Sequence, residues 1–511
     1  MDGVALESIT DVNILHALVR EQVAVIAQRD ASIAERDRAI TFKDTKIDKL
    51  THELAYLRRM RFGAKSEAMS AVHRDLFDES MAADIAAAEA ELEALRDAAP
   101  ATPRPRRKPV RRTLPADLPR ETTVHEPSSC DCTACGAALV KIGEHASEKL
   151  DVKPMEFVVR RDVYPQYACR HCQTIIAEPV APAILDRGIA APGLLAQIAI
   201  HKYADHLPLY RQEAIFARHG IELKRNTLAE WIGVMGVRLQ PLVDALRSQL
   251  LQSAVLHADE TPVSQLAPGT GKTKRAYLFA YRSAGDKPII VFDYCPSRAG
   301  KHAAHFLGDW KGALMVDDFG GYKALFGQSI TELGCWAHAR RKFFDAHAAC
   351  ASPIAEHAIG RIGELYAIEA KLRDLDDTAR WRERNKQLAP KLDEFKRWLD
   401  DLAPKVLGNS GLCRAIAYTR KRWDALVRVL DDGAYPIDNN PVENAIRPIA
   451  VGRKNWLFTG SERAGQRAAA IMSLIATAKA RGIEPHHWLA DVLTRLPTTK
   501  DRDIHTLLPL A

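Results

Sequence analysis

The sequence predicts a multidomain protein of the α/β plus α class. Its length of 511 residues is too great for one hydrophobic core and suggests about three or four domains. Five of its nine cysteines fall between Cys130 and Cys172, which indicates a small metal-binding ribbon. Segments with a strand pattern follow one another only from residue 251, after a long helical stretch, so an α/β domain should form the C-terminal half.

Residues 1–98 are predicted to be helical, with one long helix from residue 12 to about 60. Apolar residues recur there every seven positions, the period of a coiled coil: Val19, Ile26, Ile33, Ile40, Ile47 and Leu54. The companion seam is weaker, because polar and basic residues occupy its first positions. We expect self-association through this helix. The alternative is a single helix that lies on the rest of the protein.

Residues 99–121 form a basic, proline-rich linker. The prolines exclude a helix and favour an extended chain. Residues 101–120 contain seven Arg or Lys side chains against one Asp. Because clustered cations release counterions from DNA, Arg106, Arg107 and Lys108 are candidate DNA contacts, and the alternative is a solvated spacer.

The composition is that of a globular protein without a membrane span. The formal net charge is +7, so the position of the positive charge matters more than its total. No apolar run approaches the ~20 residues that cross a bilayer. The N-terminus lacks the basic start and apolar core of a secretory signal. We therefore expect a cytoplasmic protein whose clustered cysteines bind metal rather than form disulfides.

The predicted ribbon domain covers residues 122–185 and contains two Cys-x-x-Cys pairs: Cys132 with Cys135, and Cys169 with Cys172. Four thiolates bind one Zn²⁺ ion tetrahedrally, and a two-residue gap lets paired cysteines share that ion. A β-hairpin can fill the segment between the pairs. One structural zinc is the expected cofactor, with Cys130 and His171 as possible substitute ligands. The alternative is a set of unrelated buried thiols.

Residues 186–250 are predicted to be helical and to include a helix-turn-helix over residues 208–239. Gly220 can end its first helix, and Asn226 or Thr227 can cap its second. The second helix then has one apolar face: Leu228, Trp231 and Ile232. In a helix-turn-helix this second helix enters the major groove of DNA. The alternative is a helical pair that only packs in a bundle.

Two further pairs of basic residues are candidate DNA contacts. Lys224 and Arg225 lie at the start of the second helix of the helix-turn-helix. Arg453 and Lys454 lie in "VGRKNW", near the C-terminal end of the chain. Such cations suit DNA phosphates, and the alternative for the second pair is an ordinary solvated turn.

Residues 251–496 are predicted to form the α/β domain, followed by a C-terminal tail of residues 497–511. Five segments have the pattern of strands: "SAVLHADETPVSQL", "KRAYLFAYRS", "KPIIVFDYCPS", "GALMVDDFGGY" and "SITELGCWAH". A helix is expected at residues 300–308, before the fourth strand, and residues 336–432 are expected to be long helices.

Two carboxylates follow apolar strand segments of this domain. Asp259 comes after "AVLHA" and Asp317 after "GALMV", where core packing does not explain an acid. A single Asp is a common turn residue, but two at the ends of strands in one domain indicate paired metal ligands. Glu260 and Asp318 compete for the same roles.

Glu443, in "PIDNNPVENAIRP", has a simpler local interpretation. Asn440 is a good N-cap and Pro441 a good first helical residue, which gives Glu443 the third helical position of a capping box. Arg447 lies one turn further on and can pair with it. The local pattern alone therefore predicts a helix cap.

Convergence of Asp259, Asp317 and Glu443 would require cations. Two like charges 4 Å apart repel by ~4 kcal/mol at an effective dielectric constant of about 20. Carboxylate oxygens suit Mg²⁺ or Mn²⁺. Two such ions activate a hydroxyl nucleophile and stabilise the leaving oxygen in phosphoryl transfer.

Several motifs resemble those of the insertion sequence 66 family of bacterial transposases. In the C-terminal half these are "HADETPV", "MVDDFGGY", "GCWAHARRKF" and "PIDNNPVENAIRPIAVGRKNWLFTGS". Before them, "LRRMRFGAKSE", the Cys-x-x-Cys pairs and "YADHLPLYRQEAIFARHGIEL" resemble the family's N-terminal half. The resemblance covers nearly the whole chain. It implies an RNase H-like catalytic domain with a DDE triad, whose acids fall on Asp259, Asp317 and Glu443.

The same resemblance implies three further features. Residues 336–432 resemble the helical insertion that some DDE transposases carry before the third acid. Cys335 and His338 match a Cys-x-x-His signature of several such families, and the alternative is a core Cys and a His at a helix start. Family members often have Asp-Gly-Tyr where this chain has Asp317, Asp318 and a Phe, so Asp318 remains a rival for Asp317.

The resemblance implies a DNA transposase that binds terminal inverted repeats and uses two Mg²⁺ or Mn²⁺ ions for strand cleavage and strand transfer. The implied partners are the element's ends, target DNA, further copies of this chain and companion proteins from the same element, at the bacterial nucleoid. Two alternatives stay open. One is a DNA-binding regulator without catalysis, built on the zinc ribbon and helix-turn-helix. The other is a metal-dependent nuclease that does not join strands.

Overall fold

The computed structural model describes residues 12–63, 85–92 and 114–510, with gaps at residues 90, 115, 117, 128, 130, 133, 154, 155, 186, 187, 328, 407 and 409. Cys130 and the linker residues Arg106, Arg107 and Lys108 therefore lie outside the described residues. The chain divides into two compact units, one around the N-terminal helix and one that contains residues 109–511.

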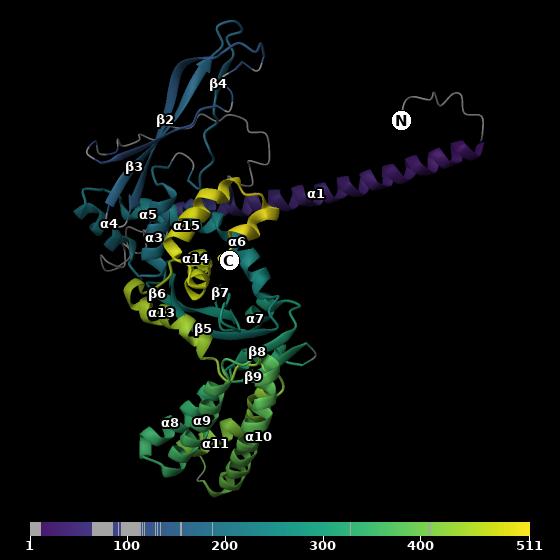
Figure 1. The fold of residues 1–511 in the computed structure, drawn as a ribbon, viewed down its shortest axis with the longest axis vertical. Coiled ribbons are helices and arrows are strands. Elements are labelled where there is room, and N and C mark those ends of the chain that lie inside the picture. Colours follow the sequence, from purple (N-terminus) through teal and green to yellow (C-terminus); the bar gives the residue numbers. More distant parts are fainter. Residues whose placement is uncertain are drawn as a thin grey trace. The chain divides into compact units, whose positions relative to one another are not determined.

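Helix α1 (Val12–Gly63) is continuous over 52 residues, which confirms the long N-terminal helix (Figure 1). Three residues at successive heptad positions, Ile26, Ile33 and Ile40, each expose 55% of their surface. The apolar seam of the predicted coiled coil is thus open to solvent along this stretch. No helix among the described residues combines the length and apolar character that a bilayer span requires.

The two Cys-x-x-Cys pairs lie in turns next to a four-stranded sheet, one before β2 and one after β3. Its main part is an antiparallel hairpin of β2 (Val140–Lys153) and β3 (Glu156–Ala168), which confirms the predicted hairpin (Figure 1). β1 (Arg120–Val124) pairs parallel with the middle of β3, and β4 (Ile175–Ala177) pairs antiparallel with its end. The hairpin therefore connects the two pairs of cysteines.

Four helices follow, as predicted for this segment: α3 (Pro192–Tyr203), α4 (Leu209–Arg218), α5 (Arg225–Arg238) and α6 (Gln240–Leu250). Gly220, with φ of +76°, adopts the left-handed conformation after α4, which agrees with its expected role. The prediction that Asn226 or Thr227 caps α5 is wrong. The helix begins at Arg225, and its N-cap position is occupied by Lys224, which has an extended backbone. The predicted apolar face is buried: Leu228, Trp231 and Ile232.

The central sheet contains all five predicted strands: β5 (Val255–Ala267), β6 (Lys272–Ser283), β7 (Ile290–Cys295), β8 (Gly312–Val316) and β9 (Ile330–Gly334). The strand order is β7-β6-β5-β8-β9. β6 runs antiparallel to both β5 and β7, whereas β5, β8 and β9 are parallel. Helix α7 (Gly300–Leu307) makes the crossover from β7 to β8, as predicted for residues 300–308.

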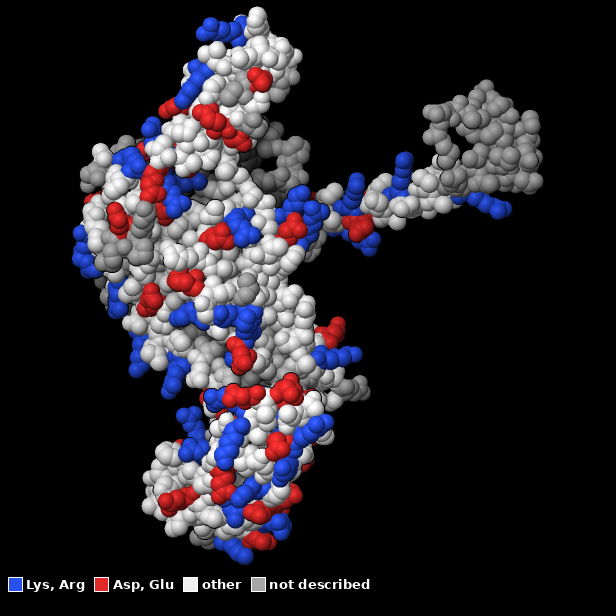
Figure 2. Space-filling model, viewed as in Figure 1, with Lys and Arg blue, Asp and Glu red and all other residues white. Residues whose placement is uncertain are grey.

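The segment of residues 336–432 is helical, as predicted, with these main helices: α8 (Trp336–Cys350), α9 (Pro353–Leu372), α10 (Asp377–Leu402), α11 (Gly411–Lys421) and α12 (Trp423–Val427). It has its own core, which includes Trp336, Phe343 and Phe395. Lys and Arg side chains intermingle with Asp and Glu over the face of this segment that Figure 2 shows. The helical segment interrupts the α/β domain between β9 and α13 (Asn440–Trp456).

The C-terminal residues pack into a hydrophobic core that also contains residues of α3, α6 and the central sheet. Helix α14 (Glu462–Ala480) lies against β7, and α15 (Pro485–Arg495) packs on α3. A 3-10 turn then spans Asp501–Leu507, and Leu507 is buried in the core shared with α3 and α6. Residues 497–510 are therefore part of the folded unit rather than an extended tail.

Candidate functional site

Asp259 and Asp317 lie at the same end of two neighbouring strands in the middle of the central sheet. β5 and β8 are parallel neighbours, and their pairing ends with His257 opposite Met315. Two residues further along each chain segment come the two acids, Asp259 within β5 and Asp317 directly after β8. The register therefore brings both acids to the same end of two adjacent strands.

The negative charges of the other two predicted acids affect the pKa of Asp259. Its pKa is raised to about 8, first by burial and then by the negative charges of Glu260, Asp317 and Glu443. A carboxyl group in this state keeps its proton near neutral pH unless a cation compensates the local negative charge. A set of clustered carboxylates with too little positive charge fits a hard divalent cation.

Glu260, the first rival, is held by other partners. Its side chain is 1% exposed and forms an ion pair with Arg298, and Tyr322 Oη donates to Glu260 Oε2 at 2.8 Å. Burial raises the pKa of Glu260, while these two partners act in the opposite direction. Successive residues of a strand point to opposite faces, so Glu260 points away from the side that Asp259 faces.

Asp318, the second rival, is neutralised by three cations. Its carboxylate lies 2.9 Å from Lys421 Nζ, 3.2 Å from Lys323 Nζ and 3.8 Å from Arg422 Nε. Although burial opposes the effect, the hydrogen bonds from Lys421 and Lys323 lower the pKa of Asp318. Asp317 has a different environment, since its Oδ1 accepts only a local hydrogen bond from the backbone N–H of Phe319 at 2.8 Å among the contacts described.

The helix that carries Glu443 does not use it as a cap. Helix α13 begins at Asn440, one residue earlier than predicted, and its N-cap residue is Asn439 without a side-chain cap bond. The predicted Asn440 cap and the capping box are therefore wrong, because Asn440 Nδ2 donates to Asp438 Oδ2 at 2.8 Å instead. The carboxylate of Glu443 is left for other contacts, and its Oε1 lies 3.6 Å from Nδ1 of His338.

Cys335 and His338 lie beside Glu443, at the junction of β9 and α8. The ligand atoms of these three residues are all within 4.8 Å of one another. Cys335 is buried at the N-cap position of α8, and burial raises the pKa of its thiol to about 12. Nδ1 of His338 and Oε1 of Glu443 are buried and lack a hydrogen-bond partner. Cys335 thus fits the core-residue alternative, whereas His338 faces the site.

Sequence reasoning missed the residues that hold α13 in place. Asn439 is fully buried and contacts His257 and Ala258 of β5. Asp438 accepts a hydrogen bond from Tyr366 Oη of α9 at 2.8 Å, and burial raises the pKa of Asp438. The available signal was the polar triplet that precedes Pro441, which a surface turn explains equally well.

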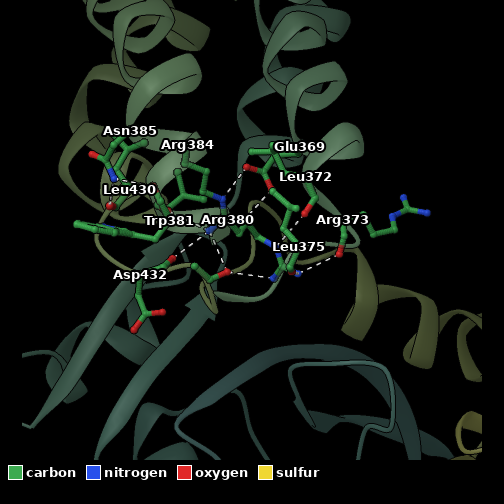
Figure 3. A network of polar contacts seen from close by, with 12 residues as sticks. Glu369, Leu372, Arg373, Leu375, Arg380, Trp381, Arg384, Asn385, Leu430 and Asp432 are labelled. Carbon is green, nitrogen blue, oxygen red and sulfur yellow. Dashed lines mark hydrogen bonds and ion pairs between the residues drawn. The ribbon is translucent and has the colours of Figure 1, made fainter. Parts of the chain in front are cut away.

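Two arginines of α10 tie the helical segment to the chain that returns to α13 (Figure 3). Nε and Nη2 of Arg384 donate to the two carboxylate oxygens of Glu369 at 2.7 and 2.8 Å. Nη1 of Arg384 and Nη1 of Arg380 both donate to the carbonyl of Gly433, at 3.3 and 3.1 Å. Arg380 and Arg384 also bind further main-chain carbonyls: Leu372, Arg373, Leu375, Val429 and Asp432.

The four predicted zinc ligands form one cluster. Their sulfur atoms all lie within 4.8 Å of one another, with Cys132 3.3 Å from Cys172 and Cys135 3.4 Å from Cys169. The pairs lie in two similar turns, in which the N–H of Gly136 donates to the Cys132 carbonyl and that of Gln173 to the Cys169 carbonyl. Hydrogen bonds with Thr174 lower the pKa of Cys172 to about 6, which favours the thiolate that binds Zn²⁺.

The candidate DNA contacts have different environments. Lys224 and Lys454 are exposed, whereas Arg225 is partly buried. Arg453 donates to the carbonyl of Pro262 at 2.7 Å, so this side chain helps to hold α13 against β5.

Helix α5 offers little surface beyond its N-terminal end. Among its 14 residues only Glu230 is exposed rather than buried or half-buried, because α3, α4 and α14 pack around the helix. This favours the bundle-packing alternative for most of the helix and limits any DNA contact to its first turn.

Comparison with known families accounts for most of the chain. The family described as "Transposase IS66 family" matches residues 187–467. A "zinc-finger binding domain of transposase IS66" matches residues 129–173, and an "IS66 C-terminal element" matches residues 473–510. A family described as "Transposase C of IS166 homeodomain" matches residues 49–123. The zinc-finger match spans all four clustered cysteines, and together they support a structural zinc.

Relatives of similar length occur in Sinorhizobium fredii. The uncharacterized protein y4jD is 36% identical over 484 residues, which cover 90% of this chain and 94% of that protein. The uncharacterized protein y4qI is 37% identical over 469 residues, which cover 88% of this chain and 86% of that protein.

Proposed function

Since this chain belongs to the IS66 family of transposases, the enzymes that move insertion sequences, we propose that Asp259, Asp317 and Glu443 are its catalytic triad. One arrangement carries the proposal: two acids follow neighbouring parallel strands, and the third lies in the first turn of α13. The strand order with its crossover helix before β8 supports an RNase H-like fold for this domain.

The three carboxylates would hold two Mg²⁺ or Mn²⁺ ions, which when bound supply activation of a hydroxyl nucleophile and stabilisation of the leaving oxygen. Burial and the neighbouring negative charges raise the pKa of Asp259, and a cation held by the three acids would favour loss of its proton. Lys421 and Arg298 neutralise Asp318 and Glu260, which supports the assignment of the remaining acids as ligands.

DNA is the partner that the family implies, and the terminal inverted repeats are its specific form in this proposal. Phosphates would be contacted by the zinc ribbon and by basic residues in three places. These are Lys224 and Arg225 at the start of α5, Lys454 of α13, and the linker residues Arg106, Arg107 and Lys108. Transposition would take place at the bacterial nucleoid, with companion proteins of the same element as further partners.

Helix α1 would join two copies of the chain for synapsis of the element's ends. The exposed heptad isoleucines support this role, since an apolar seam in an otherwise polar helix is stable in water mainly when a second helix covers it. Sedimentation of the full chain tests it: wild type should form dimers or larger assemblies, and Ile33→Asp should shift them toward monomer. Equal assembly of both proteins would contradict the coiled coil.

The neighbouring acids Asp317 and Asp318 offer a matched test of the triad. With Mg²⁺ and DNA that carries the element's ends, Asp317→Asn should abolish strand cleavage, while Asp318→Asn should retain most of it. Inactivity of Asp318→Asn alone would move the second ligand to Asp318. Absence of cleavage by wild type with Mg²⁺ or Mn²⁺ would favour a DNA-binding regulator, and cleavage without joining would favour a nuclease.

A further inference from the structure

We infer that Asn439 is a positioning residue of the active site, which fixes Glu443 relative to Asp259. The inference deepens the proposed function and rests on it, since it concerns the same triad. Asn439 lies between the strand that carries Asp259 and the helix that carries Glu443, and its exposed fraction is 0%. A buried polar side chain needs partners for all of its hydrogen-bonding atoms, and those partners show what Asn439 holds together.

The side chain of Asn439 binds β5 through both of its polar atoms. Nδ2 donates to the carbonyl of Ala258 at 2.9 Å. Only the amide nitrogen can donate to a carbonyl, so Oδ1 faces His257 and accepts from its Nδ1–H at 3.1 Å. The pairing of β5 with β8 ends at His257, so Asn439 binds the strand between that end and Asp259.

The backbone of Asn439 binds two other parts of the site. Its N–H donates to Sγ of Cys335 at 3.1 Å, at the start of the helix that carries His338. Its carbonyl accepts the N–H of Glu443 at 3.2 Å, the first-turn hydrogen bond that sets the rotation of α13. One residue therefore joins β5, the start of α8 and the start of α13.

The chemistry of this position selects a carboxamide of this length. An ordinary N-cap side chain needs only an acceptor, which Asp or Ser supplies equally well, but the Asn439 side chain accepts no cap bond from its own helix. It must donate to one group and accept from another at the same time. Asp has the same shape but no donor, so Asp at this position would set a carboxylate oxygen against the Ala258 carbonyl.

The consequence for Glu443 follows from helix geometry. Glu443 lies one helical turn from Asn439, so a small change of angle at Asn439 is carried directly to the Glu443 carboxylate. Active-site groups must be held to within roughly 0.5 Å, and a displacement of about 1 Å can reduce a rate by roughly 100-fold. Loss of the Asn439 contacts should therefore weaken cation binding by the triad before it unfolds the domain.

The test compares Asn439→Asp with Asn444→Asp in the full-length protein. Asn444 is exposed on the same helix, so the control makes the same chemical change away from the contacts described above. The measurement is the half-saturating Mg²⁺ concentration, determined by isothermal titration calorimetry without DNA, alongside kcat and KM for strand cleavage of DNA. Circular dichroism checks that both variants are folded, because Mg²⁺ binding to a partly unfolded protein would itself raise the apparent half-saturating concentration.

Asn439→Asp is expected to raise the half-saturating Mg²⁺ concentration at least about tenfold and to lower kcat by roughly 100-fold, with KM for DNA unchanged. Asn444→Asp should match wild type. An unchanged half-saturating concentration in Asn439→Asp, whether or not total activity falls, would overturn the inference and leave Asn439 a purely structural residue. Failure of wild type to cleave at any Mg²⁺ concentration would instead contradict the proposed function.

Discussion

The cysteine cluster and the proposed acid cluster are two sets of candidate metal ligands, and they are assembled in different ways. Cys132 and Cys172, whose sulfurs are 3.3 Å apart, are 40 positions apart in the sequence, with one hairpin between them. The acid cluster depends on contacts such as that of Asn439 with Ala258, which joins residues 181 positions apart. The cysteine cluster is expected to stabilise its own small domain by binding zinc. The acid cluster is instead positioned by a domain whose stability comes from core packing and long-range hydrogen bonds.

The largest effect should follow from removal of a zinc ligand. Cys169→Ser should abolish zinc binding and unfold the β2–β3 hairpin, since a structural zinc site contributes on the order of 10 kcal/mol to folding. Zinc content and hydrogen exchange check this, with Cys350→Ser as the control because Cys350 is exposed and distant in sequence. Protection of the central sheet should not change. A hairpin that stays protected without zinc would break the comparison.

A smaller effect should follow from loss of the arginine network that supports the acid cluster. Arg384→Met leaves Glu369 without its buried partner and should lower the free energy of unfolding by about 3 kcal/mol or more. Arg382→Met, an exposed position in the same helix, should change it by less than about 0.5 kcal/mol. Urea denaturation measures both variants, and equal stabilities would show that the network does not hold the helical segment.

A third effect is a pH dependence of stability without divalent cations. The folded-state pKa of Asp259 is raised from 3.8 to about 8. Between about pH 4 and pH 8 the native state therefore keeps a proton on this carboxyl group that the unfolded state has lost. The stabilisation from this group is therefore complete below pH 4 and is lost as the pH rises toward 8. Thermal melts should show this slope in wild type and less of it in Asp259→Asn or with Mg²⁺. A slope that is identical in both proteins would contradict the clustering of the acids.

The sequence allowed prediction of features that depend on local pattern. The five strands of the central sheet follow from apolar and β-branched runs, and the cysteine cluster follows from the spacing of the Cys-x-x-Cys pairs. Both signals are contained within a few neighbouring residues, so no knowledge of distant contacts was needed.

Features that depend on distant partners could not be predicted in this way. The capping box at Glu443 was wrong because the side chain of Asn439 turns into the core toward β5, and the helix starts one residue earlier than its local pattern suggests. The burial of Arg384 by carbonyls 45 to 49 residues away is equally absent from its local sequence. The assignment of the three acids came from a family resemblance, and the register of β5 and β8 bears only on Asp259 and Asp317.

Strand transfer tests the central claim most directly. A DNA end with a pre-cut 3′-hydroxyl is incubated with target DNA, Mg²⁺ and either wild type or Glu443→Gln, with retained DNA binding as the control for folding. Wild type should join the strands, and Glu443→Gln should be slower by at least about 1000-fold at equal DNA binding. Equal rates of joining would show that the carboxylate in the first turn of α13 is not a catalytic acid, and would contradict the account.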